Sequence, residues 1–502
     1  MAIAEHIQAV ARAGGRRVAI DFRGRTISWN GLGEAIVGVT ALLADRGVSP
    51  DAAIGLLGRN RLEQMAAFVA LLGAGRSVVL INAIRPAGLV AEEVEELELA
   101  CLLASDDDLA SEIVAAAERV GTLAIGMAVE GDALALHPRA AAAGEGPFRT
   151  RQPGVLIEIQ TSGTTGKPKR IPVQEHTVEA SLRDGVRKAK GAIEQGEITP
   201  KASPTLMFMP LVHTSGTFNT LMSVFECRPI VLFEKFDADE YRQALVTYRP
   251  KFAPLPPTAI KMMVDSDATR EDFASVMAVR AGTAPLPVDL QQAFEDKFGV
   301  PVLTTYGATE FLGVVTSWTL DDYRNFGRAK RGSVGRPSKG VAIRIVDPVD
   351  GNELPAGETG LLEARLARID GGREWIRTTD LARLDDDGFL YILGRADDAI
   401  IRGGFKVMAD KVADIVRTYP GIYDVIVLGR PDGRLGEVPV AVIEPYPGRD
   451  PLDAAAIRQF ARERLTPYEV PAQFHVVDRL PRTVSDKVSR PDVVRLLEGL
   501  GS

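Results

Sequence analysis

The sequence contains only two cysteines and five histidines among 502 residues. Cys101 and Cys227 lie far apart and outside any C-x-x-C pattern, so we expect two reduced packing residues in a reducing compartment rather than a disulfide scaffold. No H-x-x-x-H pair is present, which disfavours a catalytic zinc ion. The absence of a G-x-S-x-G segment argues against a serine hydrolase.

Long apolar runs and basic runs are also missing. The most apolar stretch, 66–84, is interrupted by Arg76 and Asn82, so a helix followed by a buried strand explains it better than a membrane span. The first residues include Glu5 and have no long apolar core, unlike a signal peptide. Lys and Arg total 59 against 67 Asp and Glu, and this formal charge of −8 disfavours general nucleic-acid binding. We therefore expect a soluble cytoplasmic protein without a membrane span.

The length and the hydrophobic fraction of 46% suit a large α/β body with a smaller lobe. Strand-like and helix-like segments alternate through the first half, which predicts a layered sheet with helices on its faces. Residues 105–150 are rich in Ala, Asp and Gly, and we expect them at the surface. The alternation predicts a hairpin at 18–29, a strand at 53–58, a helix at 62–72, a strand at 77–83 and further strand-helix units over 155–306.

The texture changes after residue 332. Short β runs divided by Gly, Pro and Asp predict a small β-barrel-like module over about 332–394, which completes an N-terminal domain of layered α/β subdomains at 1–394. The polar segment 395–398 is a candidate linker. The strands and helices of 399–502 suffice for a small α+β domain.

A strand running into the loop QTSGTTGKPK has the composition of an anion site. Gly163 and Gly166 allow backbone N–H groups to turn inward, and Lys169 supplies a positive charge. The spacing differs from G-x-x-x-x-G-K-[ST], the loop of ordinary P-loop NTPases, and a surface turn rich in Gly and Thr is the alternative. The hydroxyl donors of this segment are Thr161, Ser162, Thr164 and Thr165.

The segment TSGTTGKPK resembles the phosphate-loop signature of the adenylate-forming superfamily, which includes acyl-CoA synthetases, luciferases and adenylation domains of peptide synthetases. Four further segments resemble the remaining signatures in the same order, and the overall likeness is closest to acyl-CoA synthetases. They are Tyr306-Gly-Ala-Thr-Glu310, Ile376-Arg-Thr-Thr-Asp380, Gly394-Arg-Ala-Asp-Asp398, and Lys487 in PRTVSDKVSR.

The resemblance implies a nucleoside site. It places Tyr306, followed by Gly307, where a ring stacks on the purine, and Asp380 where a carboxylate accepts hydrogen bonds from the ribose hydroxyls. Arg395 is implied as a second ribose contact. The alternatives are a core tyrosine, a solvated loop acid and an arginine in an interdomain ion pair. The backbone along the other side of adenine is implied to be Gly282, Thr283 and Ala284, for which a mere turn is the alternative.

The resemblance also implies the catalytic groups. Thr309 and Glu310 are expected at the α-phosphate and its Mg²⁺, although a helix cap would also explain them. Lys487 is the expected cation that offsets charge while a carboxylate attacks the α-phosphorus, and a solvated surface lysine is the alternative. His213 is expected between the acyl pocket and the thiol tunnel, unless it is a core histidine. The acyl pocket is expected to include His213, Thr214, Ala308, Phe311 and Leu312.

Two departures from the family pattern concern the C-terminal region. Asp486 stands where the family has Gly before its catalytic lysine, so we expect its carboxylate to point away from the phosphates. The loop that lines the pantetheine tunnel is represented by Gly403, Gly404 and Lys406, but Ala409 and Lys411 replace the Pro and Glu that follow it. Adenylation with poor transfer to CoA is therefore an open hypothesis. The family hinge, about which a mobile C-terminal domain rotates, falls at Asp397.

The implied activity is ATP-dependent and Mg²⁺-dependent formation of an acyl-adenylate from a small carboxylic acid, followed by thioester formation with coenzyme A. The mostly apolar segments 213–222 and 308–315 favour an apolar acid over an amino acid. The alternatives are transfer to a carrier protein, an ATP-dependent kinase, and a non-catalytic nucleotide-binding protein. The oligomeric state is open, with a homodimer among the options.

Overall fold

The computed structural model describes the chain except residues 1, 140–142, 162–168, 191–197, 309–310, 312, 370, 397–398, 403–404, 433, 450, 484–485 and 501–502. The chain forms two compact units. The first comprises Met1–Thr283, Gln292–Val302 and Gly307–Gly313, and the second comprises Ala284–Gln291, Leu303–Tyr306 and Val314–Ser502.

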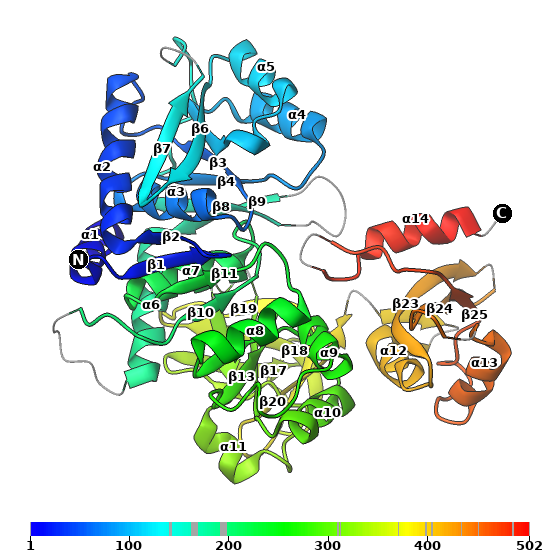
Figure 1. The fold of residues 1–502 in the computed structure, drawn as a ribbon. Helices are drawn as coiled ribbons and strands as arrows, with labels where there is room; N and C mark the ends of the chain where they lie inside the picture. The colour runs from blue at the N-terminus through cyan, green and yellow to red at the C-terminus, as the bar shows by residue number, and fades with distance from the viewer. Residues whose placement is uncertain are drawn as a thin grey trace. The chain divides into compact units, whose positions relative to one another are not determined.

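A seven-stranded sheet in the first unit has the order β7-β6-β5-β3-β4-β8-β9 (Figure 1). The five inner strands are parallel, and β7 and β9 pair antiparallel at the two edges. Every residue of β3, β4 and β5 is buried, as is typical of parallel strands covered on both faces. The strands are β3 (Ile54–Gly58), β4 (Val78–Asn82), β5 (Cys101–Ser105), β6 (Leu123–Glu130), β7 (Ala133–Pro138), β8 (Val155–Thr161) and β9 (Lys169–Gln174).

Three helices pack on this sheet. Helices α4 and α5 share a cluster of buried side chains with strands β3 to β6. Helix α3 is apolar except for Glu63 and Gln64 in its first turn. It is buried over its whole length, because it contacts both this sheet and the smaller sheet that contains β1 and β2. The helices are α3 (Leu62–Gly73), α4 (Ala87–Leu97) and α5 (Ser111–Arg119), with a 3₁₀ turn η1 (Asp106–Asp108).

The smaller sheet has the order β10-β11-β1-β2. Ser28 ends β2 and caps the next helix, because its side chain accepts a hydrogen bond from the Gly31 N–H. The end of α1 packs closely against the start of α2: a Cβ atom at Gly14 would lie 2.2 Å from the Trp29 ring. The elements are β1 (Val18–Phe22), β2 (Arg25–Ser28), β10 (Thr205–Met207), β11 (Ile230–Leu232), α1 (Ile3–Gly14), α2 (Trp29–Asp45), α6 (Glu175–Lys190) and α7 (Thr214–Phe225).

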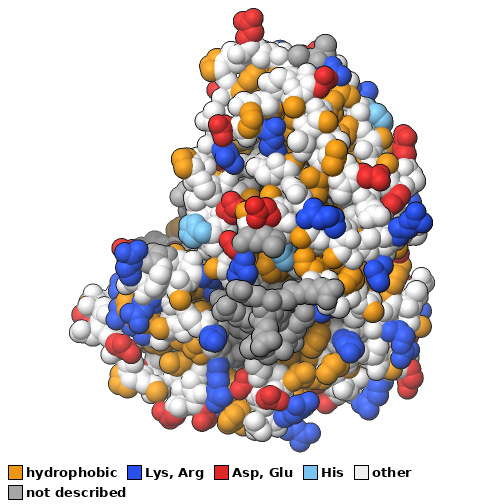
Figure 2. Space-filling view, turned by 90° about the vertical axis from the view of Figure 1, so that its left-hand side faces the viewer, with side chains coloured by type: hydrophobic (Ala, Val, Ile, Leu, Met, Phe, Trp, Pro, Cys, Tyr) orange, Lys and Arg blue, Asp and Glu red, His pale blue; other side chains and the backbone are white. Residues whose placement is uncertain are grey.

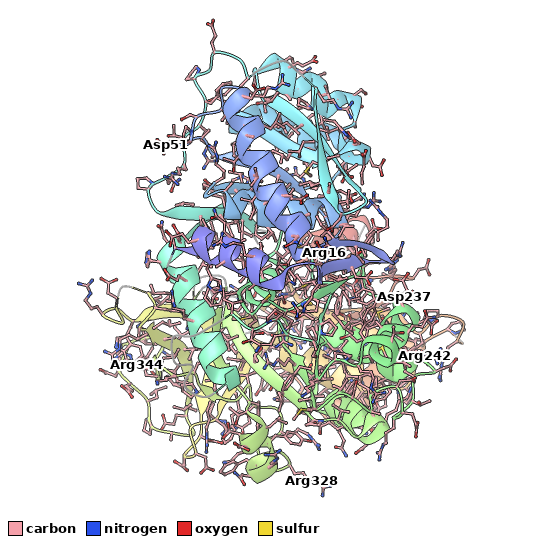
Figure 3. All side chains as sticks on the ribbon, turned by 60° about the vertical axis from the view of Figure 1, so that its left-hand side comes forward. Arg16, Asp51, Asp237, Arg242, Arg328 and Arg344 are labelled. Carbon is pink, nitrogen blue, oxygen red and sulfur yellow. The ribbon has the colours of Figure 1, made fainter. Side chains whose placement is uncertain are left out.

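Further along the chain, strand β12 pairs in parallel with strand β13. Asp237, labelled in Figure 3, caps helix α8 by accepting hydrogen bonds from the N–H groups of Asp239 and Glu240, each at 3.0 Å. The elements here are α8 (Ala238–Tyr248), β12 (Phe252–Pro254), α9 (Pro257–Asp265), β13 (Ala278–Ala281), α10 (Val288–Phe298) and β14 (Val302–Ala308).

The second unit contains a four-stranded antiparallel sheet, β17-β18-β19-β20. Buried Glu363 binds Arg344 and Arg377 within it, each at 2.7 Å (Arg344 is labelled in Figure 3). Burial opposes ionisation of Glu363, but the two guanidinium groups outweigh it and lower its pKa. The elements are β15 (Gly313–Ser317), α11 (Leu320–Phe326), β16 (Arg336–Pro337), β17 (Val341–Val346), β18 (Thr359–Leu366), β19 (Ile376–Leu384) and β20 (Leu390–Arg395).

The C-terminal lobe, residues 399–500, contains the sheet β22-β21-β24-β23, with β25 paired in parallel to β24. One face of this sheet shares a buried apolar cluster with α12 and α13, and the strands β23 and β24 share another with α14. The elements are β21 (Ala399–Arg402), β22 (Phe405–Met408), α12 (Ala409–Arg417), β23 (Ile422–Asp432), β24 (Gly436–Pro445), α13 (Ala454–Arg462), β25 (Gln473–Val476) and α14 (Arg490–Leu500).

The expected α/β fold, with layered sheets, a β-rich module and a small C-terminal lobe, is confirmed. One expectation was wrong: residues 105–150 include β6, whose residues Leu123–Met127 are buried in the seven-stranded sheet. Among the described residues, no helix combines the length and apolar character needed to cross a bilayer. Cys101 and Cys227 are buried free thiols, as expected. On the face shown in Figure 2, positive and negative side chains are interspersed.

Candidate active site

The fold brings two of the predicted nucleoside-binding residues together in the second unit. Tyr306 lies on β14, and its hydroxyl donates a short hydrogen bond to Oδ2 of Asp380 on β19. Both residues are half-buried, and the Asp380 N–H also donates to the Thr378 hydroxyl, 3.1 Å away. A carboxylate held beside an aromatic ring in this way suits recognition of a ribose next to a stacked base.

Arg395 joins the same cluster. It is the last residue of β20 and lies directly opposite Asp380 in the antiparallel pairing of β19 with β20. Its Nη2 and Nε atoms donate to the hydroxyl of Thr379 at 2.8 and 3.1 Å. The cross-strand pairing therefore places Arg395 opposite the residue predicted to bind ribose, and the neighbouring Thr379 holds its guanidinium.

The predicted adenine-side segment follows β13. Thr283 has a φ of +72°, a left-handed conformation that is unfavourable for a β-branched residue. Its side chain and that of Ala284 are exposed, while Gly282 is half-buried. Strain of this kind at an exposed turn favours a binding role over a mere turn, because an ordinary turn would be built from residues that adopt this conformation easily.

The phosphate loop itself lies largely outside the described residues. This applies to Ser162, Gly163, Thr164, Thr165 and Gly166. The structure shows its two ends: β8 and β9 form an antiparallel pair in which Thr161 is opposite Lys169. The side chains of Thr161 and Lys169 are also outside the description, so their predicted phosphate contacts stay predictions.

His213 directly precedes α7 and is half-buried. Its N–H donates to the Pro210 carbonyl at 3.0 Å, and its carbonyl accepts from the Thr217 N–H at 2.9 Å, so the residue is fixed by backbone contacts on both sides. A small, mostly apolar pocket lies along α7 and includes the predicted acyl-pocket residue Thr214. Its walls are Ile157 and Ile159 of β8, Val173 of β9, Val178 of α6, and Thr214, Thr217, Phe218 and Leu221 of α7.

The remaining residues of the second signature are only partly described. Gly307 is exposed at the end of β14, and Phe311 is fully buried. Thr309, Glu310 and Leu312 lie outside the described residues, as does the side chain of Ala308. No group of three or more potential His, Cys, Asp or Glu metal ligands occurs in the described part of the chain. The assignment of Mg²⁺ to Glu310 therefore stays a prediction.

Lys487 lies on a turn in the C-terminal lobe. The Thr483 N–H donates to the Lys487 carbonyl at 2.7 Å, and the Asp486 N–H donates to the Thr483 carbonyl at 2.9 Å. The Lys487 side chain reaches solvent, while desolvation by surrounding protein atoms lowers the pKa of its ammonium group. Within the described part of the chain Lys487 makes no ion pair, so its exposed ammonium group can reach a substrate without first breaking one.

The backbone conformation of Asp486 explains why this residue can replace the glycine of the family pattern. Its φ is +59°, the left-handed conformation that glycine adopts most easily and that Asp tolerates better than most residues. The turn geometry that a Gly would provide is therefore retained. The Asp486 side chain is exposed, and desolvation raises its pKa despite the nearby guanidinium of Arg482.

Arg482, at the start of the same turn, is an anchor that the sequence analysis did not identify. Its Nη2 atom binds Asp424 at 2.9 Å and Glu444 at 3.1 Å, and its Nη1 atom donates to the Asp486 carbonyl at 3.3 Å. Burial alone would lower its pKa, but the two carboxylates outweigh burial and raise it. The sequence offered one signal for Arg482, namely its place in the segment PRTVSDK. Its acidic partners lie 38 and 58 residues away and could not be identified from spacing.

The segment predicted to line the pantetheine tunnel is the β21–β22 hairpin. Gly403 and Gly404 lie outside the described residues, and so does the side chain of Lys406. Beside them, Nη1 of Arg402 donates to the carbonyls of Tyr468 and Val470 at 2.9 and 3.0 Å. The hairpin is thus tied to the 466–470 turn.

Ala409 and Lys411 begin the helix that follows this hairpin. Nζ of Lys411 binds Oε1 of Glu469 at 2.6 Å, and the other Glu469 oxygen accepts from the N–H and hydroxyl of Thr466. Burial disfavours the ionised form of Glu469, but these hydrogen bonds outweigh burial and lower its pKa. The family pattern has a glutamate at this position of the helix. Here the helix carries Lys411 instead, and Glu469 supplies the carboxylate that pairs with it. The predicted hinge residue Asp397 lies outside the described residues.

The Tyr306–Asp380–Arg395 cluster is the arrangement that we expect of a nucleotide-binding enzyme. Comparison with known families gives two matches: the AMP-binding enzyme model covers residues 7–367, and the AMP-binding enzyme C-terminal domain model covers residues 411–487.

Proteins of similar sequence and a solved structure of similar fold are also found. The chain is 30% identical to 4-coumarate–CoA ligase-like 5 of Oryza sativa over 77% of this chain and 70% of the relative. It is 30% identical to 2-succinylbenzoate–CoA ligase of Geobacillus kaustophilus over 96% and 95%. The crystal structure of ATP-bound MatB from Rhodopseudomonas palustris matches with a TM-score of 0.83 at 23% identity, covering 100% of both chains, which is a likeness of fold.

The chain therefore belongs to the family of AMP-binding enzymes. It is an AMP-forming ligase of the acid–thiol type, and the kinase considered as an alternative is not supported.

Proposed function

We propose that this chain activates an apolar carboxylic acid as its acyl-adenylate and then transfers the acyl group to coenzyme A. The observation that carries this proposal is the Tyr306–Asp380–Arg395 cluster, which gathers an aromatic ring, a carboxylate and a guanidinium from three strands. These are the groups that a nucleoside needs, and they occur in a chain of the AMP-binding enzyme family.

The chemistry proceeds in two displacements at the substrates. A carboxylate oxygen of the acid attacks the α-phosphorus of ATP, and pyrophosphate leaves with the electrons of the broken P–O bond. The thiolate of coenzyme A then attacks the acyl carbonyl, and AMP leaves. Lys487 is proposed to offset negative charge in the first displacement. Glu310 would hold Mg²⁺, which would supply further charge neutralisation on the phosphates.

Two features support an apolar acid with a ring. The pocket along α7 has aliphatic walls formed by Ile157, Ile159, Val173 and Val178, with the Phe218 ring beside them. The acids named for the two relatives, 4-coumarate and 2-succinylbenzoate, each contain a benzene ring and a carboxylate. Aryl acids are therefore the first substrates to test.

The Lys411–Glu469 pair supports transfer to coenzyme A itself rather than adenylation alone. The two departures that raised this doubt, at residues 409 and 411, are accommodated by a helix that begins at buried Ala409 and by a complete ion pair. Two buried free thiols also fit a cytoplasmic location for this chemistry.

The test is product analysis with a panel of aryl, straight-chain and polycyclic acids. With ATP, Mg²⁺ and the correct acid, we expect pyrophosphate and AMP, and a thioester only when coenzyme A is added. Straight-chain acids of equal carbon number provide the matched comparison for aryl acids. Release of ADP would contradict the proposal, and pyrophosphate without thioester would restrict it to the adenylation half, with a carrier protein as the next acceptor to examine.

A further inference from the structure

The two ends of the phosphate loop are joined by a set of contacts unrelated to the nucleoside cluster. Strands β8 and β9 pair so that Gln160 is opposite Arg170, one position before the Thr161–Lys169 pair. Gln160 and Arg170 are therefore the last described side chains on each strand before the loop. Both point to the same partner on helix α4.

That partner is Glu93. Its Oε1 atom accepts a hydrogen bond from Nε2 of Gln160 at 3.1 Å and a short ion-pair hydrogen bond from Arg170. Its Oε2 atom binds Arg85. Arg170 also donates to the carbonyl of Leu80 in β4 at 3.2 Å. One carboxylate thus connects both sides of the hairpin base, helix α4 and the loop after β4.

Burial makes these contacts strong. Glu93 is only 8% exposed, so an unpartnered carboxylate there would be costly and each remaining donor would lose a charged acceptor. Glycine is compatible with many backbone conformations, so the sequence between these two strands does not by itself select one. The separation and orientation of its two ends therefore limit which loop conformations direct N–H groups toward a phosphate.

We propose that Glu93 is a positioning residue for the phosphate loop, acting through Gln160 and Arg170. This inference rests on the proposed function, because it assigns the loop to the triphosphate tail of ATP. A merely structural Glu93 would hold α4 to the sheet, and its loss would lower stability without discriminating between nucleotides. A positioning Glu93 affects ligands that carry the β- and γ-phosphates and spares AMP, which lacks them.

The experiment measures binding of ATP and of AMP, each with Mg²⁺ and without acid, by calorimetry. Glu93→Gln keeps the shape but removes the charge that three donors share. We expect ATP affinity to fall by about tenfold to a hundredfold, the range of a lost charged hydrogen bond, while AMP affinity changes by less than about twofold. In steady state, the KM for ATP should rise while the KM for the acid stays within about twofold.

Asp108 offers a matched control in the same unit. Its side chain is 8% exposed and also has three donors: Arg59 at 3.1 Å, Gln64 at 2.6 Å and Ser105 at 2.8 Å. None of these three donors belongs to the base of the β8–β9 hairpin. Asp108→Asn should lower the thermal stability by a similar amount and leave the ratio of ATP to AMP affinity unchanged.

Gln160→Ala provides a milder test if Glu93→Gln fails to fold. It removes one neutral donor, so ATP affinity should fall by about threefold to tenfold with AMP again spared. Equal losses for ATP and AMP, or unchanged ATP affinity in a folded variant, would overturn the role of Glu93. A wild-type protein that binds neither nucleotide would instead refute the proposed function, which keeps the two failures distinct.

Discussion

At the base of the β8–β9 hairpin, one buried carboxylate binds three side chains. In the turn that carries Lys487, by contrast, Arg482 anchors the start to two carboxylates, while the side chains of Asp486 and Lys487 are exposed. Both segments are predicted to act on phosphate. A cradle for a polyphosphate must keep its shape, and buried charge networks resist displacement because each broken contact leaves a desolvated charge. An exposed turn can change its surroundings at little cost. The comparison therefore predicts that the base of the β8–β9 hairpin is rigid and that the turn of Lys487 is adaptable.

The largest effect is expected at Lys487. Lys487→Ala should lower acid-dependent pyrophosphate release by at least about a hundredfold, because one charge-stabilising group is lost from the transition state. The thermal unfolding temperature should stay within about 1–2 °C, since an exposed side chain contributes little to stability. Lys487→Arg, which keeps the charge, should retain part of the activity. Near-normal pyrophosphate release by the alanine variant would remove Lys487 from the mechanism and break the comparison.

An intermediate effect is expected at the ion pair between Lys411 and Glu469 in the C-terminal lobe. Lys411→Glu would place a second carboxylate against Glu469, and we expect thioester formation to fall by about tenfold while pyrophosphate release stays within about twofold. The double variant with Glu469→Lys restores opposite charges and should recover most of the thioester rate. Failure of this rescue, with both variants folded, would show that the pair does not position the β21–β22 hairpin.

The lowered pKa of Glu469 gives this pair a defined pH dependence. Its stabilisation is complete above the ordinary carboxyl pKa of about 4.3 and is lost as the pH falls through the lower folded-state value. Glu469→Gln should therefore lose stability relative to the wild type at pH 7 and approach it in acid. Denaturation curves of both proteins across this range measure the difference.

The smallest effect is expected at Asp486. Asp486→Gly should raise stability by no more than about 1 kcal/mol, because glycine adopts a positive φ without the steric cost and only part of this gain is offset by a freer unfolded chain. Pyrophosphate release should stay within about twofold. Asp478→Gly is the control, since Asp478 is exposed in the same lobe without a positive φ. That variant should be slightly destabilised; equal losses in both would show that the turn is not strained.

The sequence was sufficient to predict most of the fold, because apolar segments of strand length (β3 and β4) alternate with an apolar segment of helix length (α3). It failed at β6. The segment LAIGMAVE contains Ala and Gly, which are poor strand formers on their own, and its burial in the sheet overrides that propensity.

The candidate site divides in the same way. Tyr306, Asp380 and Arg395 could be predicted only because each lies in a segment that resembles a family signature, and their mutual contacts came from the structure. Glu93 lies in no such segment. It is 67 residues from Gln160 and 77 from Arg170. They meet because β8 pairs on one side with β9 and on the other side with β4, the strand that precedes helix α4. Such contacts depend on topology, which residue spacing does not reveal.

The Lys411–Glu469 pair has a consequence for recombination between homologues. A chimera that imports the family's glutamate at position 411 but keeps the 466–470 turn would bring two carboxylates together, one of them on a buried residue. Exchanged segments would need to carry both positions, so the 402–411 and 466–470 stretches form one heritable block despite the more than 50 residues between them.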